Sequence, residues 1–74
     1  MERVYAIHDV KNDRYLGDIV RPLFRKPITF WVIHKQDAIV YETLQDICDV
    51  CQELELIDFD RYFITEIQFE PKGA

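Results

Sequence analysis

Residues 43–56 read TLQDICDVCQELEL, and they carry the helical pattern around which the rest of the chain is organised. Thr43 is a good helix N-cap, because its hydroxyl can accept a hydrogen bond from a free backbone N–H of the first turn. Asp46 lies three residues later, where a capping box prefers Glu or Gln and where the helix dipole favours an acid. Apolar side chains then recur at helical spacing, at Leu44, Ile47, Cys48, Cys51 and Leu54. The pattern predicts an amphipathic helix from about Leu44 to about Leu56.

The segments on either side of this helix have the residue patterns that are typical of β-strands. Four segments are predicted to be strands: 3–8, 14–20, 28–34 and 61–69. The first two are expected to form a hairpin, because Lys, Asn and Asp at 11–13 favour a turn. Gly17 indicates a bulge or a close backbone approach. The run 28–34 is the most apolar, which predicts a central strand, whereas 37–41 fits either a brief strand or irregular chain.

The fold class that follows is α+β, with elements in the order β-β-β-α-β. A chain of 74 residues is expected to be one small domain, 1–74, with residues 70–74 a frayed tail. One helix packed on one face of a small antiparallel sheet of three to four strands buries each apolar stripe once. The other face of the sheet is expected either to be solvated or to pair with another chain.

Composition excludes several classes of protein. The chain is 49% hydrophobic and 14% aromatic, which argues against disorder. No apolar run approaches the roughly 20 residues that a membrane span requires. The N-terminus has no apolar signal-peptide region, so a cytoplasmic location is the expectation. Two cysteines in such a chain are expected to be free thiols.

Charge is distributed unevenly along the chain. Residues 36–60 contain eight acidic residues and no Lys or Arg, whereas residues 1–35 have a net charge of +3. This asymmetry suggests a surface that meets a charged partner, and the net charge of −5 makes nucleic acid an unlikely one. A solvated helix flank that keeps the domain soluble is the other interpretation. The candidate partner-binding residues of this acidic face are Glu42, Asp46, Asp49, Glu53, Glu55, Asp58 and Asp60.

The loop Arg21–Pro27, RPLFRKP, is a second candidate site. Its Leu23 and Phe24 either close one end of the core as a lid, or anchor a contact with another protein or a phosphate backbone, together with Arg25 and Lys26. A weak nucleic-acid binder acting through this loop is therefore an alternative function. Arg21 and Arg25 could also pair with the acidic helix of the same chain.

No motif points to catalysis. Cys48 and Cys51 form a C-x-x-C, but it lies in mid-helix among acidic neighbours that disfavour a reactive thiolate, so packing is the favoured role. His8 and His34 are the only histidines, and their spacing to the cysteines matches no zinc-finger pattern. We expect no catalytic residue, no metal site and no cofactor, and therefore no enzyme.

Several short motifs carry a resemblance to a known group. They are Tyr5-Ala-Ile7, Asp9-Val-Lys11, Arg14-Tyr15-Leu16-Gly17, Asp37-Ala38, Tyr41 and Thr43-Leu44. This series resembles small phage and prophage accessory proteins, which begin with a Tyr-Val-Ile strand and a Tyr-Leu-Gly strand. Their Asp-Ala and Thr-Leu motifs lead into an acidic helix. The resemblance covers about half the chain and leaves out residues 18–35.

The resemblance implies a phage or mobile-element protein without a defined activity. Such proteins often bind and block a host protein, and some mimic DNA. The leading expectation is a non-enzymatic inhibitor that binds a basic surface of a host protein, such as a nucleic-acid enzyme, through its acidic helix face. An anti-CRISPR or other anti-defence protein would fit that description. A structural or regulatory homodimer is the alternative from a different class.

Overall fold

The computed structural model describes residues 2–69, so the expected tail at 70–74 lies outside the described residues. Its elements are β1 (Glu2–Asp9), β2 (Arg14–Val20), β3 (Ile28–Val32), the 3-10 turn η1 (Lys35–Asp37), α1 (Leu44–Glu53) and β4 (Tyr62–Phe69). The strands form a four-stranded antiparallel sheet in the order β3-β2-β1-β4. The predicted α+β class is confirmed, and the 3-10 turn is the one addition to the expected series of elements in this part of the chain.

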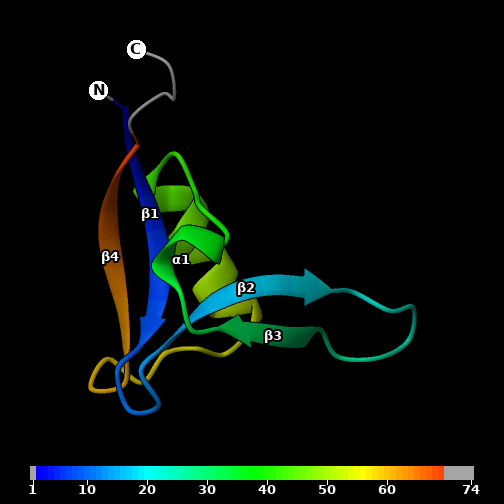
Figure 1. The fold of residues 1–74 in the computed structure, drawn as a ribbon. Coiled ribbons are helices and arrows are strands. Elements are labelled where there is room, and N and C mark those ends of the chain that lie inside the picture. Colours follow the sequence, from blue (N-terminus) through cyan, green and yellow to red (C-terminus); the bar gives the residue numbers. More distant parts are fainter. Residues whose placement is uncertain (1, 70–74) are drawn as a thin grey trace.

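The sheet consists of two ribbons that meet at a corner. β1 and β4 pair along their whole length, whereas β1 and β2 pair only where His8 lies opposite Tyr15 and Asp9 opposite Arg14. Beyond that corner β2 turns away from β1 and continues with β3 as a projecting hairpin, which runs crosswise to the β1–β4 ribbon (Figure 1). We call this hairpin, residues 14–32, the β2–β3 arm.

A bulge at Gly17 lies in β2 near the corner, where the register shifts between Leu16 and Asp18. The predicted bulge is therefore confirmed. The close approach at Gly17 is made by a side chain and not by another backbone, since a Cβ atom there would lie 2.5 Å from Cγ1 of Val32. The widening gap between β1 and β2 is filled by the chain after η1. Tyr41 exchanges two backbone hydrogen bonds of 2.8 Å with Tyr5 of β1 there.

The core lies between α1 and the corner of the sheet. Ile7 of β1, Leu16 of β2, Ile47 of α1 and Leu56 form one buried cluster. Each removes most of its apolar surface from water, which stabilises the fold by about 1.5–3 kcal/mol per side chain. α1 packs more closely on β1 than on β4, so it leaves part of the β4 side of this face uncovered.

The ends of α1 follow from local chemistry. The Thr43 hydroxyl accepts a hydrogen bond of 3.1 Å from the backbone N–H of Asp46, so the predicted N-cap is confirmed. The helix ends at Glu53 and not at Leu56 as predicted, because Glu55 has a left-handed backbone with φ 58°. The N–H groups of Glu55 and Leu56 turn back to helix carbonyls, which is the Schellman arrangement usually made by Gly. The sequence offers no glycine there to predict this stop.

The prediction of a central strand at 28–34 was wrong. β3 ends at Val32 and lies at the edge of the sheet. Its side chains alternate: Trp31 packs against the core, whereas Ile28 and Phe30 remain about half exposed. The apolar run therefore reflects an arm with a water-exposed apolar face, which periodicity alone does not distinguish from a buried strand.

Candidate protein-binding site

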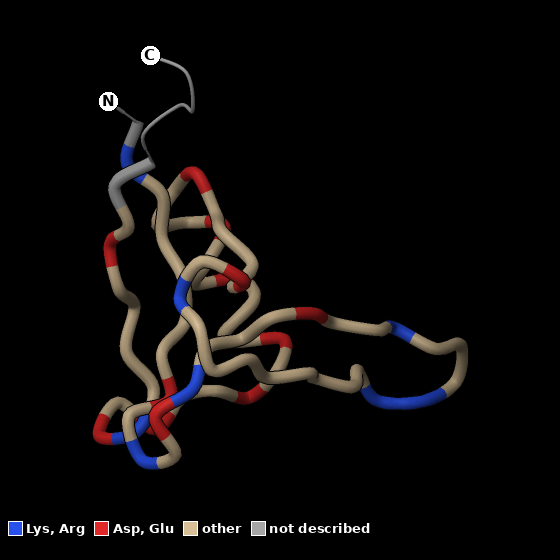
Figure 2. The backbone as a smooth tube through the Cα atoms, viewed as in Figure 1, with Lys and Arg blue, Asp and Glu red and all other residues tan. Residues whose placement is uncertain are grey.

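The seven residues of the predicted acidic face are all exposed. They extend from the loop before α1, along the helix, to the loop before β4, and Figure 2 shows these acidic positions spread over the body of the molecule. One of them is already paired: Arg21 donates two hydrogen bonds of 2.8 Å to the carboxylate of Glu53. These hydrogen bonds lower the pKa of Glu53, and they join the loop that follows β2 to the C-terminal end of α1. Part of the charge asymmetry is therefore neutralised within the chain.

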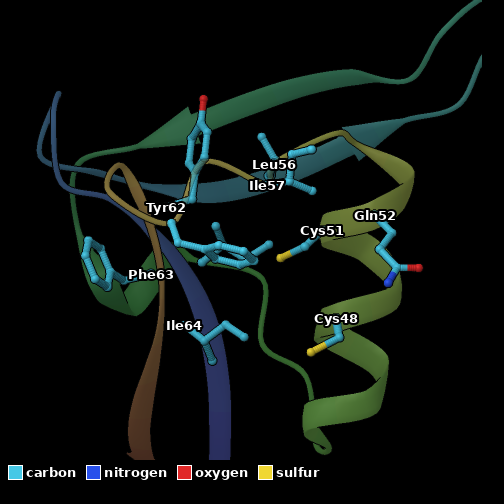
Figure 3. A pocket seen from close by; sticks show the side chains of 10 residues that line it. Cys48, Cys51, Gln52, Leu56, Ile57, Tyr62, Phe63 and Ile64 are labelled. Carbon is cyan, nitrogen blue, oxygen red and sulfur yellow. The ribbon is translucent and has the colours of Figure 1, made fainter.

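A groove opens on the helix side of the sheet, between α1 and β4, with a volume of about 320 Å³. Its lining is almost entirely apolar, and it consists of Ile7, Cys48, Cys51, Gln52, Leu56, Ile57, Phe59, Tyr62, Phe63 and Ile64. Figure 3 shows the sulfur atoms of Cys48 and Cys51 directed from the helix toward the strands, with Ile64 across from them. We call this the α1–β4 groove.

The position of α1 explains why this groove is open. A helix is about 10 Å wide with its side chains, and neighbouring strands lie about 4.8 Å apart, so one helix covers about two strands. Because α1 packs mainly on β1, it leaves the outer side of β4 uncovered. Ile64 and Phe63 of β4 stay more than 40% exposed, and Ile57 and Phe59 of the preceding loop are more exposed still. Ile7 and Leu56 at the floor of the groove belong to the core, whereas these four side chains stay largely exposed to water.

Acidic residues flank the groove lining in the sequence. Asp49 follows Cys48, and Glu55, Asp58 and Asp60 alternate with lining residues in the segment 55–60. No lysine or arginine lines the groove. The nearest basic residue along the chain is Arg61, which is bound to Asp9. The arrangement suits an apolar side chain with positive neighbours.

The predicted packing role holds for one of the two cysteines. Cys51 packs against the core cluster, and its partial burial raises the pKa of its thiol, with a smaller contribution from Cys48. Cys48 is exposed in the groove, so its expected burial was wrong. Across residues 2–69, no group of three or more His, Cys, Asp or Glu side chains is placed to hold a metal ion. His8 stacks on Tyr15 at 4.3 Å instead.

The second predicted site, the loop Arg21–Pro27, lies at the tip of the arm (Figure 1). Leu23 is 85% exposed and Phe24 is fully exposed, so the lid interpretation was wrong. Phe24 also has a left-handed backbone with φ 65°, a conformation that costs a non-glycine residue about 1–2 kcal/mol. The adjacent Arg25 and Lys26 are exposed as well, so the tip presents apolar and positive side chains together.

Sequence reasoning missed a charged cluster at the corner of the sheet. Asp9 is completely buried, and its carboxylate accepts hydrogen bonds of 3.0–3.2 Å from Arg14, Arg61 and Asn12. Burial would raise the pKa of Asp9, but these hydrogen bonds outweigh it and hold the pKa well below its ordinary value. The available signal was the alternation of β1, which places Asp9 on the same side as Ile7.

The same cluster is closed off by aromatic rings. The Arg14 guanidinium lies 4.7 Å from the centroid of Trp31, and that of Arg61 lies 5.0 Å from Tyr62. The two rings stack on each other at 5.9 Å. The hydrogen bonds satisfy the Asp9 carboxylate inside the chain, and the two guanidinium groups stay partly exposed to water. The cluster joins β1, β2 and the start of β4 and has a structural role.

Comparison with known proteins finds no matching family model, no matching curated protein and no matching solved structure. The resemblance to small phage and prophage proteins accordingly stays a prediction. Among residues 2–69 there is no helix with the length and apolar character needed to traverse a bilayer.

Proposed function

We propose that this chain is a non-enzymatic protein-binding module whose α1–β4 groove takes an apolar side chain flanked by basic residues of a partner. The observation that carries the proposal is the open apolar groove itself, which acidic residues flank in the sequence and which no basic residue lines. Stable monomers seldom leave so many large apolar side chains exposed around one hollow, and such patches usually mark binding sites.

Affinity and partner choice would come from different residues. An anchor that enters the groove would gain most of the binding energy by desolvating Ile57, Phe59 and Ile64, which are exposed in the free protein. The acidic residues would act mainly on partner choice and association rate, because exposed charges in water contribute little affinity. Glu53 would take no part, because Arg21 already neutralises it.

The partner expected from this chemistry is a host protein with a basic surface, and binding would block that surface. This matches the role that the phage and prophage resemblance implies, including inhibition of a nucleic-acid enzyme in the manner of an anti-defence protein. The proposal needs neither a cofactor nor a chemical step.

The test is a binding measurement with three synthetic peptides of one length, followed by NMR of the 74-residue protein. One peptide contains Leu-Phe flanked by Lys and Arg, a second has the same apolar pair flanked by Glu, and a third has the basic residues without the apolar pair. The groove variant is Cys48→Arg, which puts a cation on an exposed lining position. Gln36→Arg is the control, since it makes the same charge change at an exposed residue outside the lining.

We expect only the first peptide to bind, with shifts at the amides of α1 and β4 that line the groove. Cys48→Arg should weaken this binding at least tenfold, and Gln36→Arg should leave it nearly unchanged. Equal binding of the first and third peptides, or binding that survives Cys48→Arg, would refute the groove as the site. If the first peptide binds, the same pair of variants used in affinity capture from host lysate would identify the partner.

A further inference from the structure

We infer that the tip of the β2–β3 arm is itself a ligand for the α1–β4 groove, and that two copies of this chain exchange arms to form a reciprocal dimer. The inference rests on the proposed function, since it names a second copy of the chain as a partner of the same groove. It commits to the arm tip, Leu23 to Lys26, as the segment that occupies the groove.

The tip has the chemistry that the groove requires. Leu23 and Phe24 are the most exposed large apolar side chains among the described residues, and Arg25 and Lys26 follow them directly. No acidic residue occurs between Asp18 and Asp37, so the tip is purely basic and apolar. The groove has the complementary character: its walls are apolar, and exposed acidic residues follow its lining residues in the sequence, at Asp49 and in the segment 55–60.

The backbone conformation of the tip is consistent with a loop that presents its side chains to a binding partner. Phe24 is held at φ 65° while its side chain contacts nothing that would offset this conformation. Strain of this kind persists where the surrounding structure imposes it, and it concentrates at ligand-binding segments. The flanking prolines Pro22 and Pro27 restrict the loop further, which reduces the entropy lost when it docks.

The arm cannot fill its own groove. It projects away from the body of the molecule (Figure 1), and two hydrogen bonds to Glu53 hold Arg21, the first residue of the tip loop, at the C-terminal end of α1. The groove lies back at the body, between α1 and β4. A groove of about 320 Å³ is at the lower end of the range for ligand clefts, of the order of one or two side chains, so it suits a loop tip and not a whole domain face.

Reciprocal exchange also explains why the assembly would stop at two copies. A single arm-to-groove contact joins two different surfaces, and such contacts build open chains unless symmetry closes them. When each of two copies inserts its arm into the other, both contacts are satisfied in one twofold pair.

The experiment is sedimentation of the full chain from micromolar to millimolar concentration, with two defective variants. The arm variant is Leu23→Ser with Phe24→Ser, and the groove variant is Cys48→Arg; both change exposed residues outside the buried core. Ile33→Ser removes an equally exposed apolar side chain elsewhere and is the control. We expect the wild type and Ile33→Ser to dimerise, and each defective variant to dimerise at least about 30-fold more weakly.

Mixing the two defective variants gives the decisive result. The arm variant keeps an intact groove and the groove variant keeps an intact arm, so an equimolar mixture should form heterodimers through one remaining contact. A mixture that stays monomeric up to millimolar concentration would show that the tip does not bind the groove, and self-association of the groove variant would show that the arms pair with each other; either result would overturn the inference. Species larger than a dimer would overturn the reciprocal pair.

The two proposals can fail separately. A wild type that is monomeric at every concentration, but binds the basic Leu-Phe peptide in its groove, would overturn arm exchange and leave the proposed function standing. A wild type that neither binds the peptide nor dimerises would overturn the proposed function and the arm exchange together.

Discussion

At the scale of single residues, the most consequential side chain is one without a binding role. Asp9 is a buried carboxylate between two arginines, with every hydrogen bond made inside the chain. Removing one member of such a buried charge group is strongly destabilising, because it leaves the other charges without their partner. In a domain of this size, whose stability is marginal, one such contact decides whether the fold persists.

We predict that Asp9→Asn lowers the free energy of unfolding at pH 7 by about 3 kcal/mol, since the two guanidinium groups keep some contact with solvent. The folded-state pKa of Asp9 is depressed, so its stabilising contribution is complete above the unfolded pKa of about 3.9 and is lost as pH falls below it. The wild type and the variant should therefore converge in stability as pH falls through the acid range. Urea denaturation at several pH values measures both effects.

Asp13→Asn is the control for that measurement. Asp13 is an exposed acid of the same turn, and its left-handed backbone at φ 50° suits Asn as well as Asp. Its replacement should change stability by less than about 0.5 kcal/mol. A constant difference between wild type and Asp9→Asn down to pH 2 would contradict the assigned protonation state of Asp9.

At the scale of secondary-structure elements, the chain was predictable wherever local chemistry and tertiary packing agree. β2 has the predicted bounds, and the Thr43 cap begins α1 at the expected residue. The end of α1 was missed because Glu55 occupies a backbone conformation that normally requires Gly. The edge position of β3 was missed because an apolar strand gives the same pattern whether its outer face meets a core or water.

The site was predictable in part for the same reasons. Exposure of the acidic residues and of the Arg21–Pro27 loop follows from polarity and from prolines, which the sequence displays directly. The groove depends on which strand α1 covers, and no local pattern encodes that choice. Asp9 was overlooked because its partner Arg61 lies 52 residues away in the sequence.

The end of α1 supports a prediction about the helix as an element. Glu55→Gly should stabilise the fold by about 0.5–1 kcal/mol, because Gly adopts the left-handed conformation without the Cβ conflict. In a domain of this size that gain raises the melting temperature by about 3–6 °C. Thermal unfolding followed by circular dichroism measures it. Glu55→Ala removes the same charge but keeps Cβ, so it should give no such gain, and a gain equal to that of Gly would assign the effect to charge.

At the scale of the whole molecule, two electrostatic effects oppose each other when copies meet. Each chain has a net charge of −5, which repels a second copy over the dimensions of the molecule, up to 44 Å. The proposed contact between Arg25, Lys26 and the acidic flank of the groove attracts at short range. Salt screens the long-range term first, since the Debye length falls from about 30 Å at 0.01 M to about 10 Å at 0.1 M.

We therefore predict that dimer affinity passes through a maximum near 0.1 M salt. Between 0.01 and 0.1 M the net repulsion is screened and affinity should rise, whereas from 0.1 to 1 M the local attraction is screened and affinity should fall by about three- to tenfold. Sedimentation at fixed protein concentration across this range measures both the rise and the fall in affinity. Arg25→Gln with Lys26→Gln removes the local attraction and makes each chain two charge units more negative, so the affinity of this variant should still rise, more steeply, up to 0.1 M salt and should not fall above it. A wild-type affinity that increases steadily to 1 M salt would mean that apolar burial alone holds the pair, and that the charges at the arm tip take no part in choosing the groove.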